Sequence, residues 1–298
     1  MFIKTLLTQG FVTPILLAAL LALPGAGKAE DGLVIGLIPE ENIFRQVEKH
    51  RPLEAYLSEK LGVKVKFTVL SKYGDIIDRF SARGMDGAFF GIFTAVLAME
   101  KLDVQPVARL VSPSGSGTAT GYIIVRKDSG ISSARQMRGK KAVFVDRATA
   151  TGYIFPLAFL REQGVKNIEG WFSEVFFAGS HDSAVYAVLD GRADVGAVKG
   201  KILDKLTAKH PVIKEEILII AQSAALPDTT LCIKRDMDPA LRERLKKALL
   251  EMHEDPKGKE ALKLLEAEKF APARREDFKP VRDLVRKAGI NLAGYRYR

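Results

Sequence analysis

The residues VFVDRATATGYIFPLAFLREQG, positions 143–164, decide the fold of this chain. A short apolar strand, residues 142–145, leads into a turn and then into an apolar helix pattern. The helix should begin at four residues, Thr149, Ala150, Thr151 and Gly152. A helix start carries unpaired N–H groups and partial positive charge, hydroxyl side chains add donors, and glycine lets a ligand approach the backbone. The pattern therefore predicts an anion-binding turn, although threonine at a helix start commonly serves only as an N-cap.

A second strand-to-helix turn follows in VFFAGSHDSAVYAVLDGRADVGAVK, positions 175–199. The strand covers residues 175–178, the turn is Gly-Ser-His-Asp, and the helix begins at about Ser183. His181 therefore stands at a second helix start. Two such turns can face one crevice in an α/β sheet, so the pattern predicts that His181 joins the first turn in one site. The alternative is an ordinary surface or capping pair of His181 with Asp182.

The N-terminus has the pattern of a secretory signal peptide, residues 1–29. Lys4 is the charged flank, residues 15–23 are an unbroken apolar run, and Gly27 and Ala29 are the small residues before cleavage. The run is too short to span a membrane as a helix. No comparable run follows, so we expect a mature protein that is secreted and does not span a membrane.

The composition narrows the class of ligand. The chain has 298 residues, 47% hydrophobic and 28% charged, with 46 Lys plus Arg against 36 Asp plus Glu. The net charge of +10 is spread along the chain, which suits a small anion and speaks against nucleic acid. Cys232 is the single cysteine, in an apolar context, so no intrachain disulfide forms. The four histidines are too scattered for metal-ligand spacing, and we expect no metal and no cofactor.

The order of the apolar segments predicts an α/β fold of two lobes with mainly parallel sheets. Lobe 1 should comprise residues 30–118 with 226–298, and lobe 2 residues 119–225. Two crossings, residues 117–121 and 222–228, would act as hinges. Strands are predicted at 33–37, 63–70, 87–90, 104–111, 122–126 and 231–234, and helices at 44–61, 73–80, from 94, and at 239–252, 258–268 and 277–288, the last three returning to lobe 1.

Several motifs together resemble one family. They are Tyr73-Gly74-Asp75-Ile76, residues 86–91, residues 149–153, and Gly-Ser-His-Asp at 179–182. Their order is similar to that in the periplasmic solute-binding proteins of phosphonate, phosphite and phosphate ABC transporters, over about residues 33–290. The resemblance implies a type II-like periplasmic binding protein with two hinge crossings and C-terminal helices. It also implies a periplasmic location, a small anionic ligand and an ABC permease as partner.

The resemblance further implies roles for single residues. The turn at 149–152 and His181 would bind the phosphonate oxygens, and Tyr73 and Tyr122 would line the cleft. Relatives that take aminoalkylphosphonates carry acidic residues where our alignment places Lys201 and Thr229. We therefore expect a ligand without an amine, unless Lys201 is an ordinary solvated lysine.

Two other functions stay open at this point. A periplasmic sensor would present its ligand-bound form to a receptor, and the sequence barely separates this role from transport. A secreted hydrolase is the third class, with Thr151, His181 and Asp182 as its candidate groups. However, no serine or cysteine lies in a nucleophile elbow, so we expect a binding protein and not an enzyme.

Overall fold

The computed structural model describes residues 32–40, 43–113, 115–168 and 170–297. The predicted signal peptide lies outside these residues. These described residues group into one compact unit by their chain contacts. Among the described residues, no helix has the length and apolar character needed to cross a bilayer.

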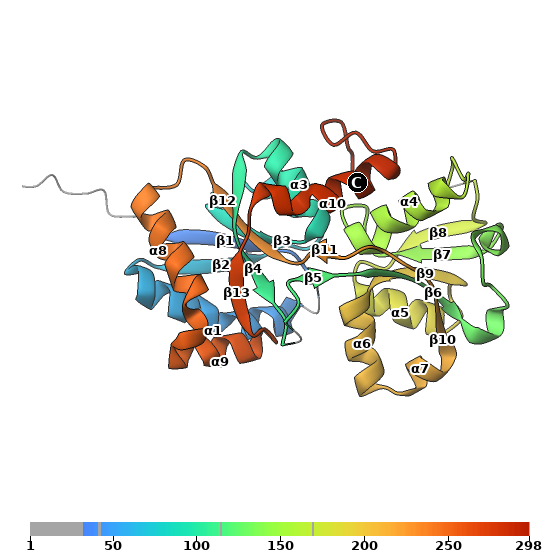
Figure 1. The fold of residues 1–298 in the computed structure, drawn as a ribbon, viewed down its shortest axis with the longest axis horizontal. Helices are drawn as coiled ribbons and strands as arrows, with labels where there is room; N and C mark the ends of the chain where they lie inside the picture. The colour runs from blue at the N-terminus through green and yellow to red at the C-terminus, as the bar shows by residue number, and fades with distance from the viewer. Residues whose placement is uncertain (1–31, 41–42, 114, 169, 298) are drawn as a thin grey trace, which may run out of the picture. The chain divides into compact units, whose positions relative to one another are not determined.

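The first lobe is built on a six-stranded sheet in the order β13-β4-β12-β3-β1-β2 (Figure 1). Strand β1 pairs in parallel with β2 and β3, whereas β12 enters between β3 and β4 and runs antiparallel to both. The sheet is therefore mixed and not mainly parallel as expected, because a strand from late in the chain is inserted at its centre. The strands are β1 (Leu33–Leu37), β2 (Val65–Val69), β3 (Gly87–Phe90), β4 (Val104–Val111), β12 (Thr230–Lys234) and β13 (Lys269–Pro272).

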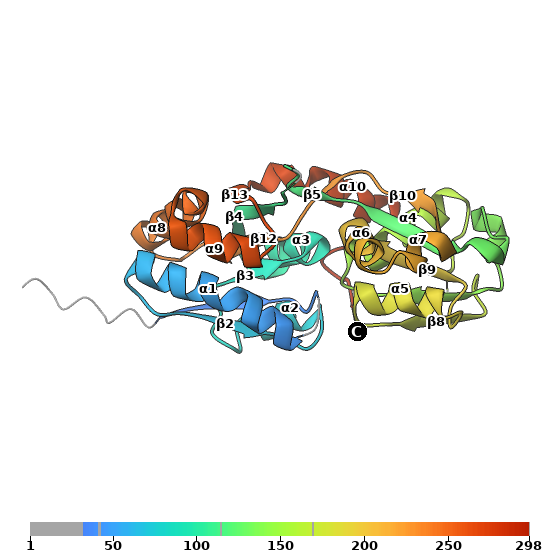
Figure 2. The same ribbon diagram turned by 90° about the horizontal axis from the view of Figure 1, so that it is seen from below.

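Helices cover this sheet through apolar faces with helical spacing. In α1 the buried side chains include Leu53, Tyr56, Leu57 and Leu61, the face that the sequence predicts. They share one apolar cluster with buried leucines of α8 and α9, and Figure 2 shows these two helices beside α1. The helices are α1 (Ile43–Leu61), α2 (Asp75–Arg79), α3 (Ile92–Lys101), α8 (Pro239–Leu250) and α9 (Pro256–Leu264).

The second lobe is built on a five-stranded sheet in the order β10-β6-β9-β7-β8. Strand β7 pairs in parallel with β8 and β9, while β6 pairs antiparallel with β9 and β10, so this sheet is mixed as well. Its strands are β6 (Gly121–Arg126), β7 (Lys141–Phe144), β8 (Glu174–Phe177), β9 (Val195–Lys199) and β10 (Ile217–Gln222). Its helices are the π-type turn η3 (Ala150–Ile154), α4 (Phe155–Glu162), α5 (His181–Leu189), α6 (Gly200–Lys209) and α7 (Val212–Glu216).

Two connections join the lobes, in the segments where the sequence predicts crossings. Strand β5 (Thr118–Ala119) lies in the first and pairs antiparallel with β11 (Leu226–Pro227) in the second. The two-lobed α/β fold is therefore confirmed. The lobe boundaries and the hinge motion stay predictions.

The C-terminal part differs from the expected run of helices. Residues 269–272 form β13, an edge strand in which Phe270 is buried and Pro272 closes the pairing. Helix α10 (Lys279–Lys287) packs against α3 and also against α4, so it does not return to the first lobe alone. Short 3₁₀ turns complete the chain at η1 (Lys127–Ser129), η2 (Ala134–Met137), η4 (Met252–Glu254) and η5 (Arg275–Phe278).

Candidate functional site

A small cavity of about 20 Å³ lies among residues of both lobes. The structure brings five predicted site residues to its wall: Tyr73, Thr149, Ala150, Thr151 and His181. The remaining lining residues are Glu40, Gly91, Ile92, Phe93, Ala148 and Lys199.

The first wall is the helix start after β7. The first hydrogen bond of this start joins the Ile154 N–H to the Thr149 carbonyl oxygen at 3.1 Å, so the N–H groups at positions 150–152 precede the first hydrogen-bonded turn. The Thr149 hydroxyl donates to the Asp146 carbonyl oxygen at 2.6 Å and is not free to donate to a ligand. Thr151 is also buried, and none of the hydrogen bonds between described residues involves its hydroxyl. Thr151 is therefore the threonine whose O–H is available to the cavity.

Gly152 has a packing role in the folded turn. A Cβ atom added there would lie 2.6 Å from the side chain of Val145, and Gly152 does not line the cavity. The missing side chain lets the helix start pack against the end of the preceding strand. The role of Gly152 in letting a ligand approach the backbone stays a prediction.

His181 is the first residue of α5, which begins two residues earlier than expected because Ser180 is its N-cap. The His181 Nδ1 atom accepts a hydrogen bond from the backbone N–H of Lys199 at 3.1 Å. Burial, reinforced by the Lys199 ammonium, lowers the pKa of His181 to about 3. The ring is therefore neutral at pH 7 with its proton on Nε2, which makes His181 a hydrogen-bond donor.

Tyr73 lies against His181, with the ring centroids 6.3 Å apart in an edge-to-face arrangement. Its side chain is 3% exposed, and its hydroxyl finds no hydrogen-bond partner among the described residues. Burial and then the negative charge of Glu40 raise the pKa of Tyr73 well above its usual value, so the hydroxyl keeps its proton. A buried donor without an acceptor is costly, and an anion in this cavity would satisfy it.

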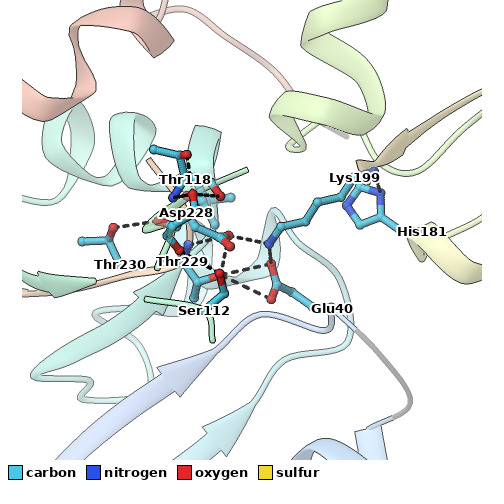
Figure 3. Close-up of polar contacts among 11 residues, drawn as sticks. Glu40, Ser112, Thr118, His181, Lys199, Asp228, Thr229 and Thr230 are labelled. Atoms are coloured by element: carbon cyan, nitrogen blue, oxygen red, sulfur yellow. Dashed lines mark hydrogen bonds and ion pairs between the residues drawn. The ribbon is translucent and has the colours of Figure 1, made fainter. Parts of the chain in front are cut away.

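Next to this donor set lies an ion pair that the sequence analysis missed (Figure 3). The Lys199 Nζ atom, at the end of β9, lies 2.5 Å from Asp228 Oδ1 and 3.2 Å from Glu40 Oε1. Burial lowers the pKa of Lys199, but the Asp228 and Glu40 carboxylates outweigh burial and raise it above its ordinary value. Burial likewise raises the pKa of Asp228, and the Lys199 ammonium outweighs burial and holds it below its usual range. Lys199 and Asp228 are therefore both charged at pH 7.

The other predicted residues lie outside the small cavity. Lys201 and Thr229 line a neighbouring cavity of about 320 Å³, where the Thr229 hydroxyl lies 3.3 Å from both Glu40 carboxylate oxygens. Tyr122 lines neither cavity, because its ring packs against Gly200, where a Cβ atom would lie 2.7 Å away. The predicted place of Tyr122 in the ligand cleft stays a prediction.

Metal chemistry and thiol chemistry have no geometry to support them in the described part of the chain. No group of three or more His, Cys, Asp or Glu residues there could hold a metal ion. Cys232 is buried in the central strand β12, and burial raises the pKa of its thiol. The small cavity is instead lined by residues that carry hydrogen-bond donors, among them Tyr73, Thr151 and His181.

Comparisons with known proteins find a matching family and several relatives. A family model described as "ABC transporter, phosphonate, periplasmic substrate-binding protein" matches residues 35–278. The chain is 27% identical over 224 residues to the phosphate-import protein PhnD of Mycolicibacterium smegmatis, covering 72% of this chain and 70% of that protein. It is 24% identical over 287 residues to the phosphonates-binding periplasmic protein of Escherichia coli, covering 95% and 84%.

Solved structures support the fold. A binding protein component of an ABC phosphonate transporter from Pseudomonas aeruginosa superposes with a TM-score of 0.77 at 21% identity, covering 86% of each chain. The PhnD1 protein of Prochlorococcus marinus in complex with methylphosphonate superposes with a TM-score of 0.75 at 20% identity, covering 86% of this chain and 98% of that one.

Proposed function

The chain belongs to the family of periplasmic substrate-binding proteins of phosphonate ABC transporters, and we propose that it captures a small oxyanion between its lobes and delivers it to an ABC permease. The proposed ligands are phosphite, methylphosphonate, phosphate or a similar tetrahedral anion. Relatives named for phosphate and for phosphonates support this class.

The observation that carries the proposal is the set of unused donors around one cavity. The Tyr73 hydroxyl, the His181 Nε2–H and the Thr151 hydroxyl belong to residues that line it, beside the N–H groups of a helix start. Hydrogen-bond donors that meet at one cavity and have no acceptor partner in the protein are typical of a site for an anion. The neutral state of His181 fits this interpretation, since a neutral ring still donates one hydrogen bond.

The same donors do not suggest a reaction. Among the described residues the Thr151 hydroxyl has no base as a partner, because the Nδ1 atom of His181 already accepts from the backbone of Lys199. Catalysis by an activated hydroxyl requires such a base. We therefore propose binding without turnover. The family is periplasmic, and the signal peptide at residues 1–29 is part of this proposal.

Thermal unfolding of the mature protein with phosphite, methylphosphonate, phosphate and sulfate tests the proposal. A bound anion at 100 times its dissociation constant should add about 2.7 kcal/mol to the free energy of unfolding. Calorimetric titration of the anion that stabilises most should give a one-to-one stoichiometry. If none of these anions stabilises the protein, the proposed function is wrong.

A further inference from the structure

We infer that the Lys199 ammonium, held by Asp228 and Glu40, fills the place of a ligand cation and restricts the site to small oxyanions without an amine. The inference rests on the proposed function, and it identifies the residue of this chain that determines which oxyanions bind.

The ion pair is built from three distant parts of the chain. Lys199 ends β9 in the second lobe, Glu40 follows β1 in the first, and Asp228 lies in the second crossing. The Lys199 and Asp228 side chains are 6% and 8% exposed, and Glu40 is 29% exposed. Asp228 is further fixed by the Thr229 backbone N–H, which donates to its Oδ1 atom at 2.8 Å. The ammonium is thus held in a defined position (Figure 3).

This position is the boundary between the two cavities. Lys199 and Glu40 are the residues that line both the small cavity and the larger one. A substituent on an anion in the small cavity would therefore meet their ion pair before it reached the larger cavity. An oxyanion with no substituent, or with a methyl group, avoids this contact.

The charge of Lys199 adds to this steric restriction on the ligand's substituent. Two carboxylates already share one ammonium, so a ligand amine would have to compete with Lys199 for them at close range. Like charges brought together at a desolvated site weaken binding by about a hundredfold or more. From the sequence, Lys201 is the lysine expected to exclude an amine, but it is exposed and lines the larger cavity and not the small one. The structure assigns this exclusion to Lys199.

The first experiment uses the unmodified protein. Calorimetric titration should give at least about a hundredfold weaker binding of 2-aminoethylphosphonate than of methylphosphonate. Ethylphosphonate, which carries the same ethyl chain without the charged amine, should bind with intermediate affinity because it meets the steric restriction alone. Equal affinity for 2-aminoethylphosphonate and methylphosphonate would overturn the inference, whatever the variants do.

The second experiment is Lys199→Ala, which leaves two carboxylates facing the space of the lost ammonium. A ligand ammonium should take that place, so the preference should reverse and 2-aminoethylphosphonate should bind at least about tenfold better than methylphosphonate. If the variant is unstable, ethylammonium chloride should raise its Tm by supplying the missing cation and should leave the unmodified protein unaffected. A folded variant that keeps the original preference would overturn the inference.

Two further variants separate the alternatives. Lys205→Ala removes a lysine of the larger cavity that is paired with Glu266, and it should leave the ligand preference unchanged. Lys201→Ala tests the lysine that the sequence pointed to, and reversal by this variant with none by Lys199→Ala would refute the role of Lys199. Failure of the proposed function is distinguishable from failure of this inference about Lys199. In the first case the unmodified protein would bind neither methylphosphonate nor phosphite.

Discussion

Replacing Tyr73 by phenylalanine should change stability and affinity in opposite directions. The substitution keeps the ring that lies against His181 and removes a buried hydroxyl with no partner among the described residues. A buried polar group without a partner costs about 1–3 kcal/mol, so the free energy of unfolding of the ligand-free protein should rise by up to that amount. A hydrogen bond to a charged group contributes about 1.5–3 kcal/mol, so the oxyanion should bind about 13- to 160-fold more weakly.

The assay pairs urea unfolding without ligand with calorimetric titration of methylphosphonate. Tyr56→Phe is the matched control, because the Tyr56 hydroxyl donates to the Ala248 carbonyl oxygen at 3.1 Å, away from both cavities. That control should lose about 1 kcal/mol of stability and keep its affinity. If Tyr73→Phe lowers stability as the control does, or binds the anion with unchanged affinity, the Tyr73 hydroxyl is not a ligand donor.

Two further predictions concern the same donor set. Thr151→Val preserves the shape of the side chain and removes its O–H, and calorimetry should show at least about tenfold weaker oxyanion binding with little change in Tm. The pKa of His181 is lowered to about 3 by burial and by Lys199, against about 6.5 in the unfolded chain. Between these two pKa values the histidine is protonated in the unfolded chain but not in the folded protein. The contribution of His181 to the free energy of unfolding is therefore complete above about pH 6.5, and it falls by up to about 1.4 kcal/mol per pH unit below that pH. Urea unfolding between about pH 7 and 4.5 should show this slope, and His181→Gln should flatten it; a slope of the same size in the variant would assign it to other groups.

The strands and helices were predictable where the signal is local. Buried runs such as residues 87–90 and 104–111 have the bounds that the sequence indicates, because every residue of the pattern lies within one element. The order of strands in a sheet is not local. Nothing in the sequence of β12 reveals that it enters between β3 and β4, and the four residues of β13 are too few for a periodic pattern.

The turn and helix start after β7 were predictable for the same reason, since their residues are adjacent in the chain. The roles within the turn were not. Whether Thr149 or Thr151 has a free hydroxyl depends on where the Asp146 carbonyl oxygen lies, which is set by the backbone after β7. The packing of Gly152 against Val145 is likewise a property of the folded turn.

Lys199 shows how far the sequence can predict a buried charged residue and its partner. Lysine at the end of the buried run VGAVK implies an acidic partner, because a buried ammonium without one is very costly. The sequence offers 36 acidic residues, and Glu40 lies 159 positions away, so the partner follows only from the fold. A buried ion pair is weak evidence for stability, since apolar replacements of similar volume are often neutral. We therefore expect Lys199 to affect the choice of ligand more than the stability of the fold. The fixed ammonium of Lys199 and an ammonium on the ligand cannot occupy the same place.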